Sequence, residues 1–179
     1  MLADLVPSVE RALRELESAD RRLAEDPVLL PAALTTASGL SEDSERLDED
    51  LRRLNSWTED LTRLDEQMEK SLVAARIDER SKAILRRQWT SLKRKWEGRL
   101  WRLHDAHLEW INAVASVHLF MEKRLGHTSI DGETVVFETD DEVREFSQLM
   151  HGVAVAAQRI VSASEQCKVA MKAVTEAVS

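Results

Sequence analysis

The chain has 179 residues, of which 43% are apolar and 32% charged. This balance excludes a disordered polar chain and is typical of long amphipathic helices. Five Gly, three Pro and no Tyr leave few turn and strand signals, so a many-stranded sheet is excluded as well.

The expected location is cytoplasmic. The first residues have no basic stretch followed by an apolar one, so no signal peptide is expected. No segment approaches the uncharged length that a membrane span needs. The single Cys167 cannot form an internal disulfide, which suits a reducing compartment.

The net charge of −8 is unevenly distributed. Residues 1–70 hold 18 acidic and nine basic side chains, whereas residues 76–102 hold ten basic and three acidic ones. Such a basic segment could bind nucleic acid or an anionic membrane. Because the whole chain is acidic and the two segments are adjacent, we favour mutual neutralisation by antiparallel packing, and expect neither nucleic acid nor membrane as the partner.

Two helices are predicted before residue 75. Apolar residues at alternating steps of three and four predict a helix over 1–25, which ends before Asp26-Pro27. Residues 27–40 form a connection, and Ser41 is a suitable N-cap for the second helix. The apolar line of the second helix is Leu51, Leu54, Trp57, Leu61, Leu64, Met68 and Leu72.

The periodicity fails near residues 75–80, where no Gly or Pro stands. We predict a turn there, with Asp78 as the N-cap of the next helix. An unbroken helix through this point is the alternative.

The third helix is predicted from about residue 80 to Leu125, closed by Gly126. A seven-residue apolar repeat keeps one line of a helix facing its neighbours. Gly98 lies within this helix, where we expect close packing against another helix. The repeat consists of Trp89, Trp96, Leu103, Trp110 and Val117, and a second line of Leu85, Leu92, Ala106, Ala113 and Phe120.

Residues 127–140 are the one place where β structure is predicted. Asp131-Gly132 is typical of a two-residue hairpin turn, although an ordered loop is the alternative. Thr139 and Glu142 have the spacing of a capping box for a last helix over about 141–179. The apolar line of that helix is Val143, Phe146, Met150, Val153, Ala157, Ile160, Ser164, Cys167, Met171, Val174 and Val178.

The pattern Arg87-x-Trp89-x-x-Leu92-x-x-x-Trp96-x-x-Arg99-x-x-x-Leu103-x-x-Ala106 resembles the last helix of a spectrin repeat. The resemblance implies an all-α fold with a three-helix bundle over residues 1–108. Residues 109–179 would then hold the continuing helix, the loop or hairpin, and a last long helix, as a partial second repeat. An antiparallel bundle of four or five helices remains the competing architecture.

No enzymatic chemistry is expected from this sequence, and no cofactor. His104 and His107 lie one turn apart, but a metal site in a bundle needs a second ligand pair, and none is evident. Cys167 lies on the apolar line of the last helix, where a free Cys acts as a small hydrophobic residue. We therefore expect neither a metal site nor a nucleophile.

Trp101 and Leu108 are seven residues apart and point away from the main apolar line. With Arg94, Arg99 and Arg102 they suggest an apolar anchor with a basic rim, suited to an acidic amphipathic helix of another protein or of a second copy. The expected function is a scaffold or adaptor module, cytoskeletal or signalling. The alternative is a self-contained bundle, such as a bacterial effector, a secretion or chaperone protein, or a self-associating coiled coil.

Overall fold

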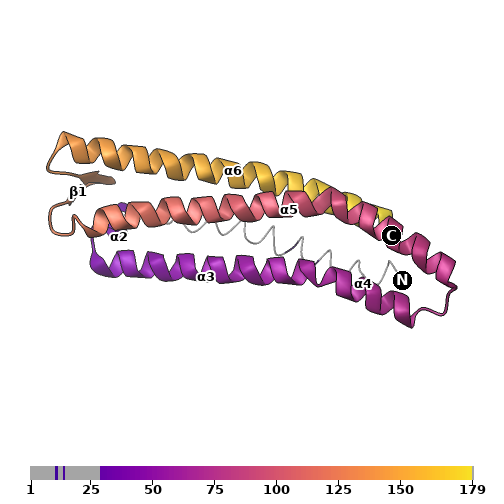
Figure 1. Ribbon diagram of the computed structural model, residues 1–179. Helices are drawn as coiled ribbons and strands as arrows, with labels where there is room; N and C mark the ends of the chain where they lie inside the picture. The colour runs from indigo at the N-terminus through magenta and orange to yellow at the C-terminus, as the bar shows by residue number, and fades with distance from the viewer. Residues whose placement is uncertain (1–10, 12–13, 15–28, 179) are drawn as a thin grey trace. The chain divides into compact units, whose positions relative to one another are not determined.

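The computed structural model describes Arg11, Arg14 and residues 29–178, so the helix expected over 1–25 lies almost wholly outside the described residues. The described chain is predominantly helical, which confirms the all-α class (Figure 1). Its helices are α2 (Pro31–Leu34), α3 (Ala37–Thr62), α4 (Leu64–Ala74), α5 (Glu79–Glu122) and α6 (Asp140–Val178), and its strands are β1 (Ser129–Asp131) and β2 (Thr134–Val136).

Helix α3 begins four residues earlier than Ser41, the predicted N-cap. Thr36 caps the helix instead, because its Oγ1 accepts a 3.1 Å hydrogen bond from the backbone N–H of Gly39. A side chain at residue 39 could not be accommodated, since a Cβ there would lie 2.4 Å from Cα of Ala33. The close approach of Ala33 and Gly39 therefore fixes where α2 ends and α3 begins.

The turn between α4 and α5 is confirmed. Helix α4 ends at Ala74 and α5 begins at Glu79. Asp78 is the cap, because its Oδ1 accepts a 2.9 Å hydrogen bond from the N–H of Ser81. Its Oδ2 accepts a second bond, of 2.7 Å, from the hydroxyl of Ser81, and these bonds lower the pKa of Asp78.

The predicted hairpin is also present, with one difference in its turn. Asp131 pairs with Thr134, so the two loop residues are Gly132 and Glu133 rather than Asp131 and Gly132. Gly132 has φ +62 and Glu133 does not have a positive φ, the pattern of a turn with Gly at its first central position. Thr139 then accepts a 3.3 Å bond from the N–H of Glu142, as the capping box predicts.

The structure divides into two compact units. Among the described residues, unit 1 comprises Arg11, Arg14, 54–104 and 161–178. As residue numbers rise along α5 they fall along α4, because Arg86 contacts Glu69 and Trp89 contacts Asp65. These two helices therefore run in opposite directions within unit 1.

Unit 2 comprises residues 29–53 and 105–160 of the described chain. Helices α5 and α6 run in opposite directions here, since Glu109 pairs with Arg159 and Arg124 with Glu142. The hairpin lies where α5 ends and α6 begins (Figure 1). Phe137, which follows β2, packs against both helices. Its ring centroid lies 5.8 Å from that of Phe120 and 5.0 Å from that of Phe146.

Trp89, Trp96, Leu103, Trp110 and Val117 of α5 are all buried. The C-terminal end of this helix differs from expectation. It ends at Glu122 instead of Leu125, because Arg124 donates its N–H to the carbonyl of Met121, three residues back, and tightens the chain into a turn.

Gly98 also differs from the sequence prediction. A Cβ at this position would meet no atom within 4 Å, so the glycine is not required for close packing.

In α6, the predicted apolar line begins too early, since Val143 is 45% exposed. The packing of α6 begins one turn later, at Phe146, which makes the aromatic contacts with Phe120 and Phe137.

Candidate functional site

Trp101 is presented at the surface of α5 within unit 1. It is 42% exposed, whereas Trp96 and Trp89 on the same helix are 4% and 5% exposed. Its ring makes an edge contact with the imidazole of His104, with 5.6 Å between the ring centroids. An exposed indole held in place by a neighbour is a typical anchor for a protein partner.

Two cations of the basic segment are neutralised by the acidic helix that precedes it, as expected. Arg86 forms a bidentate contact with the carboxylate of Glu69, at 2.9 Å and 3.0 Å. Lys93 pairs with Asp65, and this hydrogen bond raises the pKa of Lys93. The expected neutralisation thus accounts for part of the basic segment.

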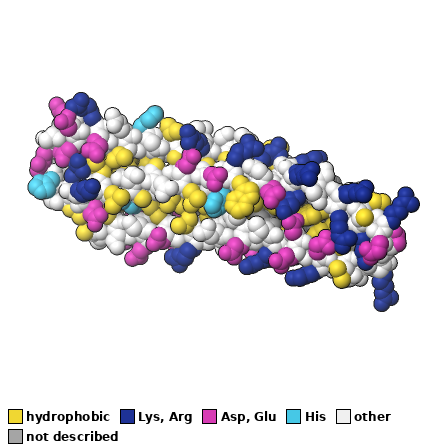
Figure 2. All heavy atoms as spheres, in the orientation of Figure 1, with side chains coloured by type: hydrophobic (Ala, Val, Ile, Leu, Met, Phe, Trp, Pro, Cys, Tyr) yellow, Lys and Arg dark blue, Asp and Glu magenta, His cyan; other side chains and the backbone are white. Residues whose placement is uncertain are grey.

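The predicted rim residues behave differently. Within the part of the chain that the structure describes, Arg94, Arg99 and Arg102 form no ion pair. Arg102 donates a 3.1 Å hydrogen bond to the carbonyl of Gly98, one turn back, and Arg99 donates to the carbonyl of Lys95. Their charges are therefore uncompensated among the described residues. Figure 2 shows many Lys and Arg side chains over the α4–α5 part of its visible face, with Asp and Glu side chains among them.

Leu108, the other predicted anchor, is half-buried and belongs to unit 2. Trp101, Arg94, Arg99 and Arg102 all belong to unit 1 and to one stretch of α5. The candidate surface, as the structure presents it, is therefore Trp101 with its neighbouring cations.

The candidate chemical groups remain dispersed. His104 and His107 are half-buried on α5, and no group of three or more potential metal ligands occurs among the described residues. Cys167 is fully buried in α6. No helix in the described part of the chain is both long and apolar enough to cross a membrane.

Sequence reasoning missed a buried polar cluster in unit 2. Asp43 and His118 are 3% and 7% exposed, and His118 Nε2 lies 3.7 Å from Asp43 Oδ2. Asp43 Oδ2 also accepts a 3.3 Å hydrogen bond from the N–H of Leu29, which has a left-handed φ of +73. Ser44 Oγ lies 3.4 Å from the other imidazole nitrogen, Nδ1. An aspartate inside an otherwise apolar line of α3 was the available signal.

These residue types could suggest nucleophilic catalysis, but their placement does not. Ser44 lies inside α3, where the surrounding backbone N–H groups are used in helical hydrogen bonds and cannot stabilise an oxyanion. Its hydroxyl lies 2.8 Å from the carbonyl of Leu40, to which it donates. The cluster instead joins the connection at Leu29 to α3 and α5, and burial lowers the pKa of His118 while Asp43 opposes that shift.

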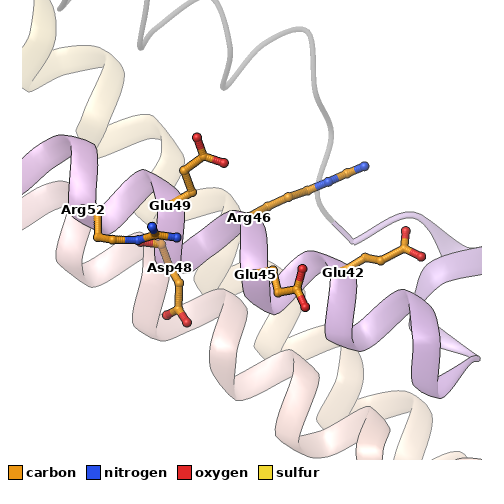
Figure 3. A pocket seen from close by; sticks show the side chains of 6 residues that line it. All are labelled: Glu42, Glu45, Arg46, Asp48, Glu49 and Arg52. Atoms are coloured by element: carbon orange, nitrogen blue, oxygen red, sulfur yellow. The ribbon is translucent and has the colours of Figure 1, made fainter.

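A shallow hollow follows the exposed side of α3 (Figure 3). All of its lining side chains come from this one helix, and along it each arginine follows two carboxylates. They are Glu42, Glu45, Arg46, Asp48, Glu49 and Arg52. This arrangement is typical of a solvated helix face, on which opposite charges follow each other at helical spacing.

No protein-family model matches the chain, and the comparisons with curated proteins and with solved structures gave no match.

Proposed function

We propose that this chain is a non-enzymatic protein-binding module of the scaffold or adaptor kind, built on an antiparallel helical bundle like that of a spectrin repeat. In this proposal Trp101 is the anchor, and Arg94, Arg99 and Arg102 attract an acidic amphipathic helix of the partner.

One observation carries the proposal. Trp101 is 42% exposed on a helix whose other Trp residues, Trp89, Trp96 and Trp110, are at most 6% exposed. Exposing an indole forgoes the stabilisation that its burial would give, roughly 2–3 kcal/mol for a large apolar side chain. A partner that covers the ring would recover that free energy on binding.

The opposite directions of α4 and α5, and of α5 and α6, support the bundle. The uncompensated cations beside Trp101 support an acidic partner, because complementary charge accelerates encounter and disfavours basic partners. The net charge of −8 makes a bare polyanion a poor ligand for the chain as a whole.

The test uses a fluorescent acidic amphipathic peptide of about 28 residues, long enough to be helical, with a Leu line on one face and Glu on its flanks. Binding is measured by fluorescence anisotropy. We expect Trp101→Glu to weaken binding about tenfold or more, because it removes the anchor and adds a repulsive charge. Binding by the wild type should also weaken as salt is raised.

The matched control is Val161→Glu, which introduces the same charge at a 58% exposed apolar residue of α6 in the same unit. It should bind as tightly as the wild type. Equal affinity of the Trp101→Glu variant and the wild type would refute the proposal. Circular dichroism must show that both variants melt near the wild-type temperature.

A further inference from the structure

A line of four exposed side chains runs along α5 within unit 1. Arg80, Arg87, Arg94 and Trp101 follow one another at intervals of seven residues, and all four are exposed. Seven residues span about 10.5 Å of helix, with a drift of about 20° around the axis, so these side chains share one face. We call them the Arg–Trp line.

The three arginines of this line form no ion pair with any residue in the described ranges. The cations that point toward α4 do form such pairs, as Arg86 does with Glu69. The fold therefore pairs the cations of α5 that point toward α4 with carboxylates. On the outward face it leaves a row of unpaired arginines that ends at the indole of Trp101.

We propose that the Arg–Trp line binds a partner helix that carries carboxylates every seven residues and one large apolar side chain that covers Trp101. This inference rests on the proposed function and specifies its partner. Two helices that lie side by side meet at seven-residue intervals, and charged residues at that interval determine which helices pair. Arg is suited to the role because its planar guanidinium binds a carboxylate through two parallel hydrogen bonds.

A helix fits this surface better than a nucleic acid does. Phosphates follow one another at about 3.4 Å of rise along each strand of a duplex, whereas the arginines of the line are about 10.5 Å apart. The half-exposed carboxylate of Glu97, which lies 3.5 Å from Nζ of Lys93, is in the same segment of α5 and disfavours a continuous polyanion there. Carboxylates at heptad intervals match the spacing of the arginines.

The experiment compares two peptides of identical composition, each about 35 residues long. The line peptide carries Glu, Glu, Leu, Glu and Glu at successive seven-residue intervals, an order that reads the same in both directions. In the dispersed peptide the same residues are distributed around the helix. We expect the wild type to bind the line peptide about tenfold more tightly than the dispersed one.

Two double variants carry the same charge change at different places on unit 1. Arg87→Glu with Arg94→Glu reverses two charges of the Arg–Trp line, and should weaken binding of the line peptide about tenfold or more. Lys70→Glu with Lys95→Glu reverses two exposed cations of unit 1 that belong neither to the Arg–Trp line nor to the cations beside Trp101. This control should lose no more than about threefold.

The outcomes separate this inference from the proposed function. Equal binding of the two peptides, or equal losses of affinity in the two double variants, would overturn the proposal that the Arg–Trp line binds the partner helix. The proposed function would still stand if Trp101→Glu weakened binding of both peptides. Single-stranded DNA of similar charge that bound more tightly than the line peptide would overturn the choice of a helical partner. Unchanged circular dichroism melts must accompany each result.

Discussion

The indole N–H of Trp89 donates a 2.7 Å hydrogen bond to Oδ1 of Asp65, and this bond joins α5 to α4 inside unit 1. Trp89 is only 5% exposed, so its N–H has little access to water when the bond is absent. Lys93 pairs with the other carboxylate oxygen of Asp65. One half-buried carboxylate thus serves two side chains of the facing helix.

Replacing Asp65 with Ala should destabilise the fold by about 1–3 kcal/mol, since it leaves the Trp89 N–H without its acceptor. Urea unfolding monitored by circular dichroism measures the change. The control is Glu66→Ala, which removes an exposed neighbour whose contact with Lys70 is 3.8 Å long. That variant should stay within about 0.5 kcal/mol of the wild type. Equal losses would show that the bond to Trp89 contributes nothing.

The two Trp residues at positions 96 and 101 should respond differently to truncation. Trp96→Ala removes a 4% exposed side chain and should cost about 3–5 kcal/mol, because a cavity remains in the core. Trp101→Ala removes a 42% exposed ring and should cost about 1 kcal/mol or less. Chemical denaturation of both variants provides the measurement. A large loss for Trp101→Ala would identify it as a core residue and remove the basis for a binding role.

The buried cluster predicts a specific pH dependence of stability. Burial lowers the pKa of His118 below its ordinary value of 6.5, and the neighbouring carboxylate of Asp43 opposes this shift. Ser44 and Arg46 are the other groups of α3 in the cluster. Ser44 Oγ lies 3.4 Å from Nδ1 of His118, and the guanidinium of Arg46 lies 3.8 Å from the carboxylate of Asp43. Because the net shift is downward, the folded protein favours the neutral imidazole. This stabilisation is complete above the unfolded pKa, and it is lost as the pH falls from about 6.5 through the lowered folded pKa.

The measurement is the free energy of unfolding at several pH values from about 7.5 to about 5. Wild type should lose stability over this interval more steeply than His118→Gln, whose side chain does not titrate. The comparison uses the slope, so a constant loss of stability in the variant does not affect it. Parallel slopes would show that His118 does not contribute to the pH dependence.

Arg124 links the beginning of α6 to the end of α5 through side-chain contacts. It lies 3.5 Å from the ring centroid of Phe120 and pairs with Glu142 at 3.1 Å and with Glu145 at 3.3 Å. Arg124→Ala should cost about 1–3 kcal/mol, because it removes a cation–π contact and two ion pairs around a mostly buried guanidinium. Arg124→Lys should recover only part of this, since an ammonium cannot bind in the same planar geometry. The matched control, Lys123→Ala, changes an exposed cation one residue earlier and should have little effect on the urea midpoint.

The sequence alone determined the helical class and the local signals at several helix ends. Asp78 and Thr139 form caps where predicted, because a cap depends on residues only three positions apart. The apolar spacing likewise placed Trp89, Trp96 and Leu103 on one line of α5, and all three are buried. These features follow from the 3.6-residue repeat of a helix, which can be recognised in the sequence of that helix alone.

The tertiary structure decided what depends on distant residues. The start of α3 is set by the approach of Ala33 to Gly39, and the meeting of Asp43 with His118 joins positions 75 residues apart. Spacing showed that Trp101 points away from the main apolar line, but whether another helix covers it depends on the packing of the whole unit. Packing also decides which basic residues form ion pairs. Arg86 pairs with Glu69 of α4, whereas Arg94 forms no ion pair with a described residue. Periodicity fixes the face on which a side chain lies, and only packing determines what that face meets.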